Sequence, residues 1–279
     1  MLEVFFRAVE DLDERRHRTR QVRNPGPLQA HFEHLLATDP ASSIVADDGG
    51  HVVAFGMLMV RGGDAFLSFL FVMPRWQGRG LGRAVLDACL EGAAGIEHRS
   101  TCAEADQLVS TGLYASLGIT PRLPIYLLRG ALTEDSLPNL GDDLRASPVA
   151  TAAVAAVDRE LTGYERPQDH SFWSGHDRRG WMFESAGGSV LGYGYAHGSG
   201  RLGPVAAQRA ELLPSFLGHL VRSTQVLEGW QILVPGPAAS ALQPLLLAGM
   251  RMDGTPAVYC AEAPGPRFDR YLPMSFALL

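Results

Sequence analysis

The sequence predicts an α/β (α+β) fold of two similar domains, each a mixed, mostly antiparallel twisted sheet flanked by helices. Three observations support this prediction. The chain has 279 residues, more than one compact core usually holds. In the first half, short apolar strands separated by glycine turns precede a glycine-rich loop and a helix. A fainter copy of this order follows in the second half.

The first half is predicted to run strand, two helices, three strands, helix, strand, helix, strand. Pro25-Gly26-Pro27 separates the first two helices, and glycine turns join the three strands as an antiparallel meander. The expected elements are a strand at 3–9, helices at 10–23 and 28–37, strands at 43–46, 52–60 and 65–72, a helix at 83–90, a strand at 101–103, a helix at 106–117 and a strand at 122–129.

The second half repeats this outline, with Gly249 ending a helix as Gly118 does. We therefore predict a domain at 1–131, a linker at 132–147 that contains Pro138 and Gly141, and a degenerate domain at 148–279. The expected elements of the second half are strands at 181–185, 190–197 and 201–206, a helix at 211–222, a strand at 231–234, a helix at 239–247, and strands at 257–261 and 271–279.

Composition excludes several classes of protein. A net charge of -6 argues against nucleic acid as the main partner, because phosphate binding needs a positive face. No apolar run is long enough for a membrane span, and the first residues do not resemble a signal peptide, so we expect a soluble cytoplasmic protein.

Cys89, Cys102 and Cys260 are too scattered for a disulfide framework. His31 and His34 have no third ligand at a readable spacing, so we expect no metal.

The most informative segment is residues 72–82, Val-Met-Pro-Arg-Trp-Gln-Gly-Arg-Gly-Leu-Gly. A strand that leads through a glycine loop into a helix leaves several backbone N–H groups without acceptors at the helix N-terminus. Gly80 and Gly82 let a ligand approach the backbone, and Arg79 and Arg83 add positive charge. The segment predicts a site for a phosphate or pyrophosphate, although the loop alone would suit a simple strand-to-helix turn equally well.

Two motifs together resemble the GNAT superfamily of acyl-CoA-dependent N-acetyltransferases. Gln77, Gly80 and Gly82 match the family's Gln/Arg-x-x-Gly-x-Gly/Ala pattern at the coenzyme A pyrophosphate. Leu113-Tyr114 and Gly118 match its Leu-Tyr-x-x-x-Gly-Phe helix end, with Ile119 in place of Phe. The resemblance covers about the first 130 residues. It implies acetyl-CoA as cosubstrate, bound by Leu70, Phe71, Val72, Gln77, Gly78, Arg79, Gly80, Leu81, Gly82, Arg83 and Gln107.

By the same resemblance Tyr114 donates a proton to the leaving thiolate. The alternative is a tyrosine at the boundary of the helix and the core. Some relatives carry a glutamate base on the third meander strand, where this chain has Phe66 and apolar neighbours. We predict Glu104 as the substitute base, acting through a water molecule. Equally, Glu104 could simply be a carboxylate at the start of the next helix, where the helix dipole favours a negative charge.

A basic run precedes the second helix and has two interpretations. It is either a solvated face or a basic clamp, on the coenzyme's 3'-phosphate or on an acidic partner. The run contains Arg15, Arg16, His17, Arg18, Arg20 and Arg23.

The second half lacks the residues of the coenzyme site. If Val205 is placed on Val72, Leu213 and Ser215 stand in the places of Gly80 and Gly82, and Leu245 in the place of Tyr114. Polar and aromatic residues nevertheless gather there, and they contribute either to acceptor recognition or to an ion-pair network around Arg166 and Asp169. The set is Gly163, Tyr164, Glu165, Arg166, Asp169, His170, Trp173, Tyr193 and Tyr195.

The function predicted is acetyl transfer from acetyl-CoA to the primary amine of a small molecule, with the N-terminal domain catalytic. One alternative is a protein or peptide N-acetyltransferase, and another is a noncatalytic acyl-CoA sensor. We expect no nucleic-acid or membrane partner. The two domains could act as a pseudo-dimer, while the acceptor and the oligomeric state are not readable from the sequence.

Overall fold

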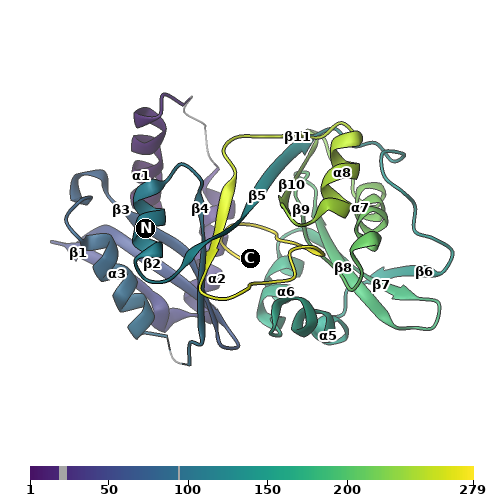
Figure 1. The fold of residues 1–279 in the computed structure, drawn as a ribbon, viewed down its shortest axis with the longest axis horizontal. Coiled ribbons are helices and arrows are strands. Elements are labelled where there is room, and N and C mark those ends of the chain that lie inside the picture. Colours follow the sequence, from purple (N-terminus) through teal and green to yellow (C-terminus); the bar gives the residue numbers. More distant parts are fainter. Residues whose placement is uncertain (19–23, 94) are drawn as a thin grey trace. The chain divides into compact units, whose positions relative to one another are not determined.

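The computed structural model describes residues 1–18, 24–93 and 95–279. These residues form two compact units, 1–101 and 102–279 (Figure 1). The division falls inside strand β4 (His98–Glu104), rather than at the predicted linker, because the strand that follows pairs with strands from the second half of the chain. The assignment of separate functions to residues 1–131 and 148–279 stays a prediction.

The first unit contains the first four strands of an eight-stranded sheet, with helices on both faces. Strands β1, β2 and β3 form the predicted antiparallel meander, and β4 joins β3 in parallel. The elements are α1 (Leu2–Arg15), α2 (Pro25–Thr38), the 3-10 turn η1 (Pro40–Ser42), β1 (Ser43–Asp48), β2 (His51–Arg61), β3 (Asp64–Val72), the 3-10 turn η2 (Pro74–Trp76), α3 (Leu81–Glu91) and β4 up to residue 101.

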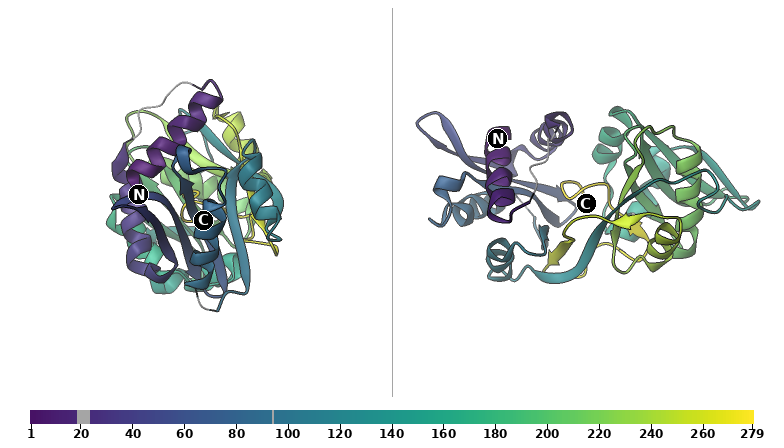
Figure 2. Two further views of the ribbon diagram at one scale, coloured as in Figure 1. Left: turned by 90° about the vertical axis from the view of Figure 1, so that its left-hand side faces the viewer. Right: turned by 90° about the horizontal axis from the view of Figure 1, so that it is seen from above.

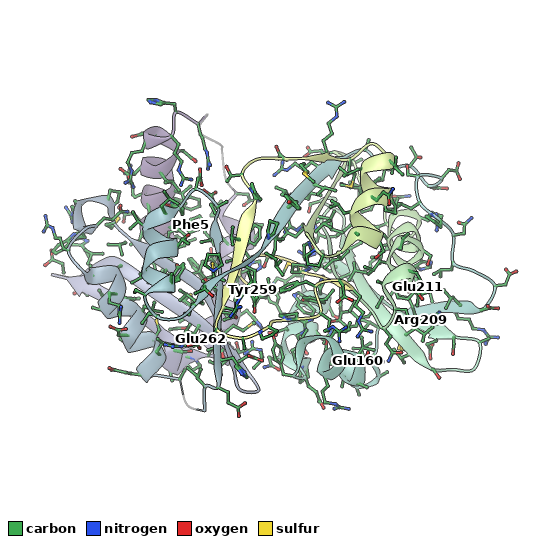
Figure 3. All side chains as sticks on the ribbon, viewed as in Figure 1. Phe5, Glu160, Arg209, Glu211, Tyr259 and Glu262 are labelled. Atoms are coloured by element: carbon green, nitrogen blue, oxygen red, sulfur yellow. The ribbon has the colours of Figure 1, made fainter. Side chains whose placement is uncertain are left out.

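Helices α1 and α2 cover one face of this sheet (Figure 2), and aromatic rings fill the space beneath them. The ring of Phe5, labelled in Figure 3, lies 4.7 Å from that of Phe71. The ring of Phe32 lies 4.8 Å from that of Phe69. Helix α3 packs on the opposite face above Gly56, where an added Cβ would lie 2.8 Å from Cys89 Sγ. Glycine is needed there because any side chain would push α3 off the sheet.

The predicted opening strand at 3–9 is wrong, because these residues are part of α1. Val4 and Ala8 are buried one helical turn apart, so the burial follows a period of 3.6 residues rather than 2. The helix also ends at Arg15 instead of continuing to 23. Of the basic run, Arg20 and Arg23 lie outside the described residues.

The second unit contains two sheets. Strand β5 pairs antiparallel with β10, β11 and β12, and the second sheet has the order β13-β9-β8-β7-β6. The elements after β4 are α4 (Leu108–Ala115), β5 (Thr120–Gly130), β6 (Leu144–Pro148), α5 (Thr151–Thr162), α6 (Pro167–Gly175), β7 (Arg178–Ser185), β8 (Val190–His197), β9 (Leu202–Ala207), the 3-10 turn η3 (Ala210–Leu212), α7 (Leu213–Arg222), β10 (Trp230–Pro235), α8 (Ala239–Leu247), β11 (Arg251–Met252), β12 (Ala257–Ala261) and β13 (Tyr271–Leu272).

Three features of the second unit differ from the prediction. Helices α5 and α6 were not predicted, and the linker contains a strand, β6, that pairs with β7. The closing strand expected at 271–279 ends at Leu272, since Pro273 follows it and proline cannot donate a hydrogen bond to a strand ladder.

The two halves share one local structure that the sequence predicted. After α4, Gly118 has a φ of 85°, and the N–H of Ile119 donates to the carbonyl of Tyr114 over 3.0 Å. After α8, Gly249 has a φ of 97°, and the N–H of Met250 donates to the carbonyl of Leu245 over 3.1 Å. Both ends therefore close with a glycine in the left-handed region, and Leu245 occupies the place of Tyr114.

Within the described ranges, no helix has both the length and the apolar character that crossing a bilayer requires.

Candidate functional site

The first half of β3 pairs with β4, whereas its carboxyl-terminal half does not and pairs only with β2. The parallel register with β4 covers Asp64 to Leu67 of β3 and ends at Thr101 of β4, whose hydroxyl donates to the Leu67 carbonyl over 2.9 Å. At the same point the register with β2 passes from Leu67 to Phe69 across a bulge. A bulge bends and twists its strand, so the end of β3 diverges just before the glycine loop.

The glycine loop turns the chain from β3 into α3. Gly78 and Gly80 have φ angles of 74° and 79°, and Gly80 caps the N-terminus of α3. A Cβ built on either glycine meets no atom within 4 Å, so these positions need glycine for their dihedral angles. The space in front of the helix is open.

This geometry fits a bound pyrophosphate. The first helical N–H groups of α3 have no acceptor within the helix and carry the positive end of its dipole. Gly82 adds no side chain beside them; its missing Cβ would contact only Val72 Cγ2, at 3.6 Å.

Gln77 links the loop to the neighbouring elements. Its Nε2 donates to the Val72 carbonyl over 3.0 Å, and its Oε1 accepts from Arg15 Nη2 over 3.2 Å. Gln77, predicted to contact the coenzyme, therefore also holds the loop in position, because both the nitrogen and the oxygen of its amide form hydrogen bonds. The same bond brings Arg15, from the basic run, to the edge of the loop.

Two further arginines stand at the loop. The guanidinium of Arg79 lies 5.5 Å from the centre of the Trp76 ring, and Arg83 pairs with Asp87 through Nε at 2.9 Å. Arg79 is exposed and is the cation best able to meet a phosphate, while part of the charge of Arg83 is neutralised.

The other predicted site residues, Glu104, Gln107 and Tyr114, belong to the second unit. Glu104 ends β4, its carbonyl accepts the N–H of Gln107 over 2.9 Å, and Gln107 is the N-cap of α4. Tyr114 is 6% exposed on the last turn of α4. The structure thus places Glu104 and Gln107 at one strand-to-helix connection, with Tyr114 at the far end of the helix that follows, and residues 70–83 at another connection. Their chemical roles stay predictions.

The equivalent connection in the second half lacks the features of the glycine loop. The turn η3 precedes α7, which begins at Leu213. When the starts of α3 and α7 are superposed, Leu212 stands in the place of Gly80 and Pro214 in that of Gly82. Both lie one residue earlier than the sequence alone suggested. Leu212 has a right-handed backbone, Leu213 is fully buried, and proline lacks an N–H.

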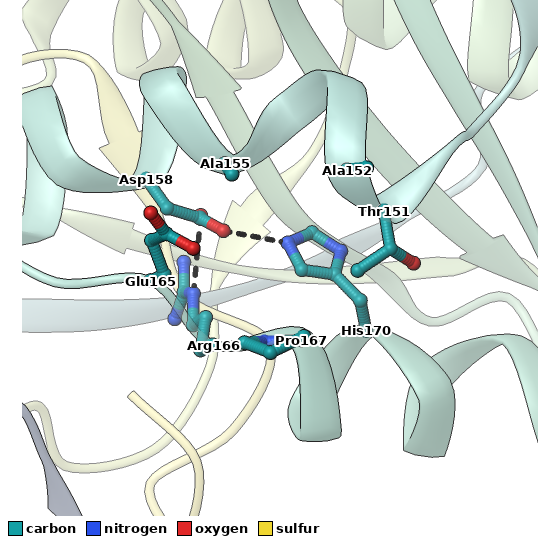
Figure 4. A pocket seen from close by; sticks show the side chains of 8 residues that line it. All are labelled: Thr151, Ala152, Ala155, Asp158, Glu165, Arg166, Pro167 and His170. Carbon is teal, nitrogen blue, oxygen red and sulfur yellow. Dashed lines mark hydrogen bonds and ion pairs between the residues drawn. The ribbon is translucent and has the colours of Figure 1, made fainter.

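The polar and aromatic set of the second unit forms a buried network whose centre is Asp158 (Figure 4). Asp158 Oδ1 accepts from Arg166 Nε at 3.2 Å and from Tyr193 at 2.6 Å, and Oδ2 lies 2.8 Å from His170 Nε2. Burial by itself would raise the pKa of Asp158, but Arg166, His170 and Tyr193 lower it below its usual value.

Arg166 has a partner that the sequence did not reveal. It forms an ion pair with Asp158, and its Nη groups donate to Tyr271, Tyr193 and the Leu279 carbonyl. Asp158 follows Val154 and Val157 on the apolar face of α5, which is the signal that could have revealed it. A hollow of about 320 Å³ borders the network beside Ala155 and Pro167.

These contacts favour a structural role for the network over acceptor recognition, since its charged groups pair with one another.

The three cysteines are free, and burial raises the pKa of the Cys89 and Cys260 thiols to about 11. No group of three or more side chains suited to bind a metal occurs in the described part of the chain.

Comparison with known proteins agrees with the predicted fold. Residues 6–119 match the model of the acetyltransferase (GNAT) family. A putative acetyltransferase from Pyrococcus horikoshii has a similar structure, with 15% identity and a TM-score of 0.77 over 99% of this chain and 90% of that one. No curated protein sequence matches.

Two other solved structures have the same fold. A tandem GNAT protein from the clavulanic acid biosynthesis pathway is 16% identical, with a TM-score of 0.59 over 95% of each chain. A GCN5-related N-acetyltransferase from Kribbella flavida is 14% identical, with a TM-score of 0.57 over 92% of this chain and 68% of that one. Residues 6–119 thus match the GNAT family, and the chain as a whole shares the fold of a tandem GNAT protein.

Proposed function

We propose that this protein transfers the acetyl group of acetyl-CoA to the primary amine of a small molecule, with the glycine loop of the first unit as the coenzyme site. One observation carries the proposal. Residues 78–83 present a helix N-terminus, two left-handed glycines and the exposed Arg79 to open space. This combination suits a pyrophosphate.

The reaction needs a neutral amine. An alkylamine with a pKa near 10 is only about one part in a thousand neutral at pH 7, so a base must take its proton. In our proposal Glu104 accepts this proton through a water molecule. The amine nitrogen then attacks the thioester carbon, forming the C–N bond.

The remaining steps stabilise charge and release the thiol. A backbone N–H at the diverging end of β3 stabilises the developing oxyanion. As the C–S bond breaks, Tyr114 donates its hydroxyl proton to the thiolate, and the proton that the attacking nitrogen then loses restores the Tyr114 hydroxyl. The products are an acetylated amine and free coenzyme A.

A noncatalytic acyl-CoA sensor is the second candidate, and one observation favours it. Residues 65–72 of β3 contain no carboxylate, and Asp64 lies at the end of the strand away from the glycine loop, so the part of β3 that leads into the loop offers no general base. The two candidates differ in turnover. A screen of acetyl-CoA with polyamines, amino acids, aminoglycosides and peptides, read as free-thiol release, should give amine-dependent turnover for an enzyme. Tight binding without turnover for any acceptor would support the sensor.

A further inference from the structure

Two arginines of the second unit converge on the segment after β13. Arg201 donates from Nε and Nη2 to the Met274 carbonyl, over 2.9 Å and 2.6 Å. Arg178 reaches the Met274 sulfur from Nη2 and the Gly203 carbonyl from Nη1, each at 3.4 Å. Both side chains are partly buried, and both have only uncharged acceptors.

No carboxylate within the described residues forms an ion pair with Arg178 or Arg201. The nearby charges are mostly positive. Arg129 adds a third guanidinium but is paired with Asp253 at 2.8 Å. His197 stands opposite Arg178 in the β7–β8 register, and Asp177 is the acidic group that acts on this histidine.

This environment is unfavourable for two guanidinium ions. Burial lowers the pKa of Arg201 to about 9, with Arg178 and Arg129 adding to the effect, and burial lowers the pKa of Arg178 to about 10. Arginine keeps its proton in proteins, so the lowered pKa values mean that burying these two positive charges costs free energy. An anion bound beside the two side chains would offset that cost.

The unused donors have access to a ligand. Arg178 Nε and Arg201 Nη1 make no hydrogen bond in the structure, yet neither belongs to the buried polar atoms without a partner. They therefore face a space that solvent can enter. Two neighbouring guanidinium groups present forked donors that match a carboxylate or a phosphate.

We propose that Arg178 and Arg201 form a binding site for a small oxyanion, a carboxylate or a phosphate group, separate from the glycine loop. The site does not depend on acyl transfer. The alternative is that Arg201 only fastens the segment around Met274 to the sheet.

The test measures the melting temperature of the full chain in inorganic phosphate, in acetate and in chloride at equal ionic strength. An anion that binds the folded state raises the melting temperature as its concentration exceeds the Kd. We expect phosphate or acetate to give a larger rise than chloride, and the more effective of the two identifies the ligand group.

Arg178→Gln and Arg201→Gln should each weaken this binding at least tenfold by calorimetry. Arg209→Gln is the matched control: it removes the same charge from an exposed pair with Glu211 (Figure 3) and should bind as the unmodified protein does. The proposal is wrong if neither anion exceeds chloride, or if Arg178→Gln and the control respond identically. A loss of stability in Arg201→Gln with no change in anion response would support the fastening role alone.

Discussion

Replacing Gly82 with aspartate should weaken acetyl-CoA binding while leaving the protein folded and slightly more stable. Gly82 is the second residue of α3, and a Cβ there contacts only Val72 at an ordinary 3.6 Å. A carboxylate near a helix N-terminus stabilises the helix by about 0.3–1 kcal/mol. Stability and binding should therefore change in opposite directions.

The loss of affinity follows from Coulomb's law. At a separation of about 6 Å and an effective dielectric constant of about 40 for this exposed loop, two like charges repel by about 1.4 kcal/mol. That is about a tenfold loss of affinity for each phosphate charge. With two charges on the pyrophosphate, Gly82→Asp should bind acetyl-CoA roughly 10- to 100-fold more weakly, and the difference should shrink as salt is added.

The assay is titration calorimetry at low salt, with Gly82→Asn as the matched control. Asparagine has the size of aspartate without its charge, so it should retain most of the affinity. Gly82 is a better position than Gly80, whose φ of 79° would strain any replacement by about 1–2 kcal/mol. If Gly82→Asp and Gly82→Asn are both folded and both bind acetyl-CoA as tightly as the unmodified protein, there is no pyrophosphate at this helix N-terminus.

Three further predictions concern other parts of the site and the network. Tyr114→Phe should bind acetyl-CoA normally and lose turnover; unchanged turnover would leave Tyr114 a structural role only. Arg166→Ala should destabilise the protein by about 3–5 kcal/mol because it leaves Asp158 buried without its cation, and a raised acceptor KM with an unchanged melting temperature would instead support acceptor recognition. Because the folded pKa of Asp158 is lowered, its contribution to stability is present above its unfolded pKa of about 3.9 and is lost as the pH falls through the folded value. Denaturation of the unmodified protein should therefore steepen below about pH 4, and it should do so less in Asp158→Asn; parallel acid curves would contradict this.

The sequence was most informative where local chemistry determines local structure. The meander from β1 to β3 was predictable because apolar strands alternate with glycine turns at Gly49-Gly50 and Gly62-Gly63. The loop was predictable because Gly78 and Gly80 adopt angles that other residues avoid. The matching helix ends at Gly118 and Gly249 were found for the same reason.

The sequence could not predict strand pairing between distant residues, or the structure of segments whose apolar pattern suits both a strand and a helix. The four apolar residues Val4, Phe5, Phe6 and Ala8 suit either a strand or a helix, and burial against the sheet decides for α1. The pairing of β5 with both β10 and β12 joins residues at least a hundred positions apart, which no local pattern specifies. Asp158 was missed because a buried charge interrupts an apolar face and gains its meaning only from Arg166 and His170.

The central claim is that the chain has one acyl-CoA site, built on the glycine loop, and that the second half has none. Titration calorimetry of the unmodified full chain with acetyl-CoA measures this directly. We predict one molecule bound per chain, and no measurable binding by the double variant Arg79→Glu/Gly82→Asp. Two molecules per chain, or one that persists in the double variant, would contradict the assignment.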